Sequence, residues 1–126
     1  LAQGRWVISD RFTDASFAYQ GGGRGLASDK LAVLEQWTQG ALQPDLTLYF
    51  DVPVALGQQR VSQIKAADRF EKEQAGFFQR VRAAYLDRAG QFPDRIKCID
   101  SSQSLMEVKA AVEQTLKPLL NHEYYL

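Results

Sequence analysis

The sequence predicts an α/β fold in which helices pack on a mostly parallel sheet. Short runs rich in apolar, β-branched and aromatic residues alternate along the chain with segments whose apolar residues recur every three or four positions. This alternation is typical of parallel sheets connected by helices. Each of the short runs also ends at an aspartate, and parallel sheets collect their functional groups at the carboxyl ends of their strands.

Three segments are expected to form strands. Residues 5–9 (Arg-Trp-Val-Ile-Ser) are β-branched and aromatic, which favours a buried strand. Residues 46–50 (Leu-Thr-Leu-Tyr-Phe) are almost continuously apolar, as expected for a strand that is covered on both faces. Residues 96–99 form a shorter third candidate. The aspartates that follow these segments are Asp10, Asp51 and Asp100.

Four segments have the apolar spacing of helices, and one segment is expected to be a loop. The helical segments cover residues 31–41, 54–64, 77–89 and 104–120. Ser104 and Glu107 have the spacing of a capping box at the start of the last helix, and Pro118 is expected to bend or end it. Residues 20–27 contain four glycines and are interpreted as a flexible loop.

Composition narrows the classes of function. The chain has 126 residues, which fits one domain, and 15 basic residues balance 15 acidic ones, so nucleic acid is not an expected partner. Cys98 has no second cysteine to pair with, which fits the cytoplasm, and we expect it in the core rather than as a nucleophile. One Cys and one His make no zinc site. No apolar run reaches the ~20 residues that cross a bilayer, so no membrane partner is expected.

The densest polar segment covers residues 10–25. Arg11 follows a predicted strand, where its guanidinium could grip a phosphate at two points. Ser16, Tyr19 and Gln20 share one face if the segment is helical, and together they could bind a nucleoside. The alternative, which composition alone favours, is a polar turn with Tyr19 in the core. The glycines at 21–25 lack the Gly-Lys-Ser/Thr ending of a phosphate-binding loop and indicate a mobile connection.

Other polar positions have a structural alternative as well. Asp51 precedes a helix, and we favour a capping role for it over a functional one, whereas the two interpretations of Asp10 are balanced. Residues 60–73 mix charges of both signs. They could form a lid over a polyphosphate, but a solvated connection between helices is the favoured interpretation.

Taken together, these segments resemble bacterial thymidylate kinases. Five motifs occur in the order and spacing of that family and extend over nearly the whole chain: residues 9–12, 18–25, 44–52, 68–71 and 77–85. One short motif would be weak, but five in register are specific. The resemblance implies an α/β P-loop nucleoside monophosphate kinase fold of three layers. Its parallel sheet would be incomplete here, because the central P-loop strand is absent.

The resemblance also implies a reaction, its cofactors and its partners. Residues 1–126 would be the C-terminal portion of a longer kinase, with an acceptor-site segment at 10–25 and a lid-like segment at 60–73. The full chain would transfer the γ-phosphate of ATP to dTMP with Mg²⁺ present and would form a homodimer. The alternatives are a kinase for another nucleoside monophosphate and a non-catalytic fragment or pseudo-kinase that binds a nucleotide.

Roles for single residues follow from the same resemblance. Asp10 would lie beside the magnesium and phosphates, and Arg11 would contact the phosphate of dTMP. Ser16 and Gln20 would bind thymine, and Tyr19 would pack on the deoxyribose.

The donor side of the site is implied in the same way. Arg60 would lie on the adenine of ATP, with Ser101 and Ser102 on the far side of that base. The lid of the bacterial enzymes carries a catalytic arginine, but only Lys65 lies between Arg60 and Asp68. Three alternatives stay open: Lys65 replaces that arginine, Arg69 moves into its place, or another residue has this role.

Overall fold

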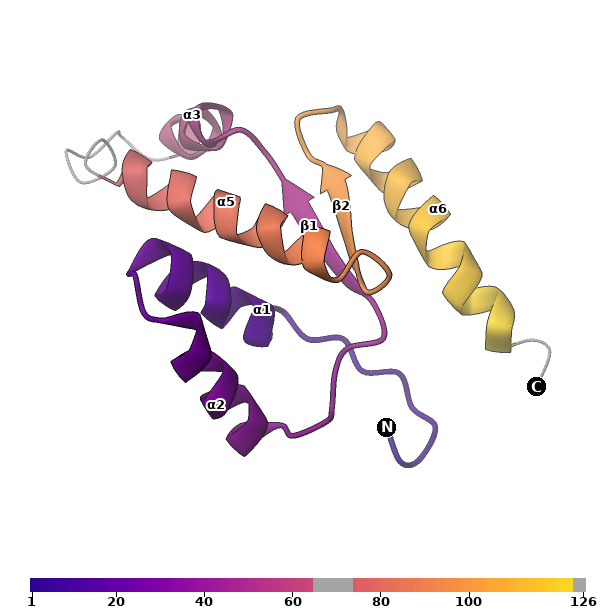
Figure 1. Cartoon of the computed structure of the whole chain (residues 1–126). Helices are drawn as coiled ribbons and strands as arrows, with labels where there is room; N and C mark the ends of the chain where they lie inside the picture. Colours follow the sequence, from indigo (N-terminus) through magenta and orange to yellow (C-terminus); the bar gives the residue numbers. More distant parts are fainter. Residues whose placement is uncertain (65–73, 124–126) are drawn as a thin grey trace.

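The computed structural model describes residues 1–64 and 74–123 and has helices packed on a parallel sheet (Figure 1). Strand β1 (Thr47–Asp51) pairs with β2 (Ile96–Asp100) so that Thr47 lies opposite Ile96 and Asp51 opposite Asp100. Both strands therefore end in an aspartate at the same edge. The predicted α/β class and the parallel sheet are confirmed, with strand bounds that differ by one residue.

The predicted helices are confirmed with small changes in their bounds. The helical elements of the described ranges are α1 (Thr13–Ser16), the π-helix η1 (Phe17–Gly23), α2 (Ser28–Thr38), α3 (Val54–Ile64), α5 (Ala75–Gln91) and α6 (Leu105–Glu123). The capping box before α6 is present, because the Glu107 carboxylate accepts hydrogen bonds from the Ser104 backbone N–H (2.9 Å) and hydroxyl (2.8 Å). Pro118 does not end α6, which continues to Glu123.

The prediction of a strand at residues 5–9 is wrong for this structure. The segment is irregular, and its apolar side chains are exposed, with Ile8 at 95%. A strand requires a neighbour that pairs with its backbone N–H and C=O groups. In the part of the chain that the structure describes, the sheet consists of β1 and β2, and residues 5–9 pair with neither of its outer edges.

The prediction of a flexible loop at residues 20–27 is wrong for its first half. Residues 20–23 are the end of η1, and the irregular backbone begins only after Arg24. A Cβ on Gly22 would lie 2.5 Å from the Cβ of Ala84, and a Cβ on Gly23 would lie 2.4 Å from a ring carbon of Phe77. These glycines therefore let η1 approach α5 closely instead of making the chain mobile.

The core is small and lies where η1, α2 and α5 meet and beneath β2. Its buried apolar residues are Ala18, Leu31, Val81, Ala89, Ile96 and Ile99. Cys98 does not belong to it, because it is exposed on β2, so its expected core position is wrong. Partial burial and the nearby Asp51 carboxylate raise the pKa of the Cys98 thiol, which disfavours the reactive thiolate. Among the described helices, none is long and apolar enough to cross a membrane.

Candidate functional site

An open pocket of about 330 Å³ lies along α1 and the start of η1. Its lining residues are Arg11, Phe12, Ala15, Ser16, Tyr19 and Gln20. The four residues that sequence analysis assigned to the acceptor nucleotide are all among them. The predicted shared face is thus confirmed, although the helix that carries it changes from α to π, a distortion that often occurs at functional sites.

Arg11 is held in an unusual backbone conformation at the mouth of this pocket. Its φ is 65°, in the left-handed region that residues other than glycine rarely adopt. The hydroxyl of Ser9 donates a hydrogen bond of 2.9 Å to the Arg11 carbonyl oxygen. The guanidinium lies 5.0 Å from the centre of the Tyr19 ring. This geometry presents an exposed positive charge beside an aromatic plate.

Tyr19 has one side toward the core and lines the pocket with the rest of its ring. It packs against Phe77 at 6.1 Å and edge-on against Tyr85 at 6.2 Å between ring centres. Tyr85 in turn stacks on Tyr49 of β1 at 4.4 Å. Burial, together with the neighbouring Tyr19, raises the pKa of Tyr85 to about 12, so its phenol is neutral at physiological pH. Tyr19 therefore packs partly against other aromatic rings and partly lines the pocket, and its role in binding a nucleoside stays a prediction.

Three aspartates differ in their surroundings: Asp51 and Asp100, which end the two strands, and Asp10, which follows residues 5–9. Asp51 accepts two hydrogen bonds from Arg82 of α5, at 2.9 and 3.1 Å, so its side chain forms an ion pair, and its capping role stays a prediction. Asp100 accepts hydrogen bonds from Ser102. Asp10 is exposed, and within residues 1–64 and 74–123 its carboxylate forms no hydrogen bond or ion pair.

The described residues contain no group of three or more side chains that could hold a metal ion. Magnesium, however, is usually bound by one or two carboxylates, with water and substrate phosphates completing its shell. The free carboxylate of Asp10, next to Arg11, fits that kind of site. It does not fit a metal bound by protein ligands alone.

The residues assigned to the adenine are brought together from distant parts of the sequence. Arg60 of α3 donates a hydrogen bond of 2.7 Å to the carbonyl oxygen of Ser101, which follows β2. The Ser101 backbone N–H donates to the Asp51 carbonyl at 2.7 Å, and this bond places the turn at the carboxyl edge of the sheet. Arg60, Ser101 and Ser102 therefore lie in one region, as expected. Lys65 and Arg69 lie outside the described residues, as does most of the lid-like segment 60–73.

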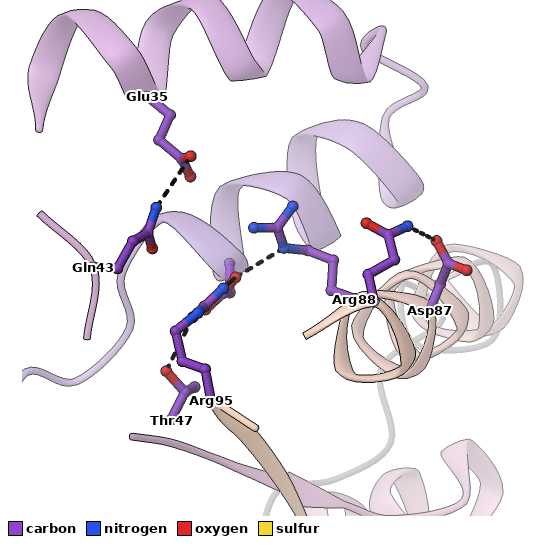
Figure 2. Close-up of polar contacts among 8 residues, drawn as sticks. Glu35, Gln43, Thr47, Asp87, Arg88 and Arg95 are labelled. Atoms are coloured by element: carbon purple, nitrogen blue, oxygen red, sulfur yellow. Dashed lines mark hydrogen bonds and ion pairs between the residues drawn. The ribbon is translucent and has the colours of Figure 1, made fainter. Parts of the chain in front are cut away.

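Sequence analysis missed a buried ion cluster directly behind the pocket. Asp14 is 4% exposed and accepts hydrogen bonds from Arg88 Nε (2.8 Å) and from Arg95 Nη1 and Nη2 (2.6 and 3.1 Å). Figure 2 shows Arg88 and Arg95 converging, with Thr47 beside Arg95. The sequence offers no local signal for this cluster, because the two arginines follow Asp14 by 74 and 81 residues.

The Asp14 cluster predicts a dependence of stability on acid pH. Burial opposes the charged carboxylate, but the hydrogen bonds from Arg95 and Arg88 outweigh it and lower the pKa of Asp14 below 3.8. A carboxyl whose pKa is lower in the folded state stabilises the fold above its unfolded pKa, and that contribution is lost as the pH falls through the folded pKa. When the pH is lowered below about 4, we expect the free energy of unfolding, measured with urea, to decrease.

Asp14→Asn should flatten this acid limb relative to the native sequence. The control is Asp87→Asn, since Asp87 is an exposed carboxylate on α5 that accepts a hydrogen bond only from Gln91 at 2.9 Å among the described residues. If both variants showed the same acid dependence as the native sequence, Asp14 would not be its source.

The comparisons with known proteins all agree on one family. The family model for thymidylate kinase matches residues 1–112. The chain is 64% identical over 116 residues to the thymidylate kinase of Nitrosospira multiformis, an alignment that covers 92% of this chain and 57% of that protein. It is 61% identical over 117 residues to the thymidylate kinase of Nitrosomonas europaea (93% and 54% covered) and 55% identical over 116 residues to that of Cupriavidus necator (92% and 57% covered).

These alignments show which family the chain belongs to and how much of its relatives' length it covers. The chain spans somewhat more than half the length of the curated relatives that it matches. The family match extends over all the residues of the pocket, the ion cluster and the Arg60–Ser101 contact. The chain belongs to the thymidylate kinase family.

Proposed function

We propose that the full-length protein containing this chain transfers the γ-phosphate of ATP to dTMP, giving ADP and dTDP. The observation that carries this proposal is the pocket in which Arg11, Ser16, Tyr19 and Gln20 converge. A cation, a hydroxyl, an aromatic ring and an amide on one face match the phosphate, sugar and base of a nucleoside monophosphate. Relatives named thymidylate kinase support thymine as the base.

The acceptor would be held at three points within segment 10–25. Arg11 would bind the phosphate of dTMP through its guanidinium and keep it in line with the donor. Ser16 and Gln20 would hydrogen-bond the thymine, and Tyr19 would pack on the deoxyribose. Phosphoryl transfer depends on such positioning and on cations that stabilise the charge of the equatorial oxygens.

The donor would bind at the carboxyl edge of the sheet. Arg60 would lie on the adenine of ATP, with Ser101 and Ser102 on its far side. Asp10 would hold Mg²⁺ together with water and the donor phosphates, and the ion would neutralise charge on those phosphates. Segment 60–73 would form the lid, with Lys65 or Arg69 as its cation. We further propose a cytoplasmic homodimer that has no nucleic acid or membrane partner.

A comparison of substrates tests this function. The full-length enzyme should phosphorylate dTMP in preference to dUMP, UMP and CMP when ADP formation is followed. Calorimetry on the same protein should show binding of dTMP. If the enzyme preferred another nucleotide, that nucleotide and not dTMP would be its substrate. If it bound dTMP without turnover, it would be a non-catalytic nucleotide-binding protein.

Removal of the Gln20 amide should weaken binding of dTMP selectively. A side-chain amide that pairs with a base edge contributes about 1–3 kcal/mol of discrimination, so Gln20→Ala should raise the dissociation constant for dTMP by about 10-fold. ATP affinity should be unchanged. Gln91→Ala is the matched control, because that amide lies on α5 and bonds Asp87. Unchanged dTMP affinity in the Gln20 variant would contradict a role for it in base binding.

A further inference from the structure

The helical segment that lines the pocket is attached to α5 at both of its ends. α1 and η1 run beside α5 (Figure 1), with Asp14 near the C-terminal end of α5 and Gly23 near its N-terminal end. Three of the pocket-lining side chains, Ser16, Tyr19 and Gln20, lie between these two attachments. Their position therefore depends on how the segment is held at each end.

At the Asp14 end, the attachment is ionic and largely removed from water. The side chains of Arg88 and Arg95 are 11% and 15% exposed and that of Asp14 is 6% exposed. The Arg88 guanidinium also lies 3.8 Å from the centre of the Phe17 ring. Arg95 immediately precedes β2, and its backbone carbonyl accepts a 2.8 Å hydrogen bond from Thr47 of β1. Asp14 is thereby tied to α5 and to the sheet at once.

At the other end, the segment is attached by hydrogen bonds and by close packing. Arg80 donates hydrogen bonds to the Gly23 carbonyl at 3.3 and 3.1 Å, and the closeness of Gly22 and Gly23 to α5 leaves no space for a Cβ. The hydrogen bonds at Asp14 fix the other end, next to Ala15 and Ser16, because each arginine offers donors in a rigid plane.

We propose that Asp14 is a positioning residue for the acceptor nucleotide. Asp14 does not line the pocket, but its neighbours Ala15 and Ser16 do, so the carboxylate sets the direction in which the lining side chains point. Side chains that bind a substrate must be held by a second layer of contacts, and a displacement of about 1 Å can cost 100-fold in rate. This inference rests on the proposed binding of dTMP in the pocket.

The test is a steady-state comparison in the full-length enzyme. Asp14→Asn keeps the size of the side chain but removes the charge that holds both arginines. We expect the KM for dTMP to rise by about 10-fold, with the KM for ATP unchanged, at a temperature well below the melting temperature of the variant. Asp87→Asn, which removes an exposed carboxylate from the residue before Arg88 in α5, should leave both values unchanged.

A second variant separates positioning from stability. Arg95→Lys keeps the positive charge but loses the bidentate hydrogen bonds of the guanidinium to Asp14. Like Asp14→Asn, it should raise the KM for dTMP and leave the KM for ATP unchanged. An unchanged KM for dTMP, or equal rises in both KM values, would overturn the inference. If neither variant folded, the role of the cluster would be stability alone, and the inference that Asp14 positions the acceptor site would be overturned as well. A native enzyme that does not phosphorylate dTMP at all would instead refute the proposed function, before any variant is compared.

Discussion

Arg11→Ala in the full-length enzyme is expected to reduce turnover of dTMP by about 100- to 1,000-fold, the usual effect of removing one group that stabilises transition-state charge. Arg11 is exposed, and among the described residues its guanidinium forms no ion pair with a carboxylate. Its charge is therefore available to an anion in the pocket. The substitution removes one contact with the Tyr19 ring, so we expect stability to change by less than about 1 kcal/mol.

Arg24→Ala is the matched control for this prediction. Arg24 is also exposed and its guanidinium lies 4.8 Å from the centre of the Phe77 ring, so both variants lose a cation and one aromatic contact. Only Arg11 lines the pocket. Arg11→Lys should restore activity in part, because a lysine supplies charge without the bidentate fork. Equal losses in Arg11→Ala and Arg24→Ala would show a general effect of charge and contradict a specific role.

Asp14→Ala is expected to lower the free energy of unfolding by about 3 kcal/mol, at the lower end of the range for breaking a buried ion pair. The physical reason is that Arg88 and Arg95 would keep their charges in a largely buried place without the carboxylate. Their small remaining exposure lets water compensate in part. Urea denaturation at neutral pH measures the loss, and Asp87→Ala should change stability by no more than about 0.5 kcal/mol.

The origin of this loss can be checked with apolar replacements. Replacement of Asp14, Arg88 and Arg95 together by apolar residues of similar size should recover much of the lost stability, since no unpaired charge remains buried. A loss below about 1 kcal/mol in Asp14→Ala would show that water already screens the cluster well.

Local patterns were sufficient for most of the helices, for both strands and for part of the site. The recurrence of apolar residues predicted α2, α3, α5 and α6, because that spacing places them on one face whatever the rest of the chain does. Ser16, Tyr19 and Gln20 were grouped for the same reason, and the pocket contains all three. Each of the two segments ends in an aspartate, and parallel pairing brings both aspartates to the same edge of the sheet.

Predictions that depended on distant neighbours were the ones that failed. The segment at residues 5–9 has the composition of a strand, but it pairs with neither outer edge of the sheet formed by β1 and β2. The glycines at 22 and 23 are typical of a loop in sequence, and only the positions of Phe77 and Ala84 show that they serve close packing. Composition states what a segment can form, whereas hydrogen bonds and steric contacts with other segments decide what it does form.

By itself the sequence determined the α/β class, the order of the main helices and strands, and the face that carries Ser16, Tyr19 and Gln20. Those features follow from spacings of a few residues. Tertiary structure alone decided that Asp51 pairs with Arg82 and that Asp14 is held by two arginines, one near the C-terminal end of α5 and one just before β2. Ion pairs between residues so far apart have no periodicity to reveal them, because their partners are chosen by packing and not by distance along the chain.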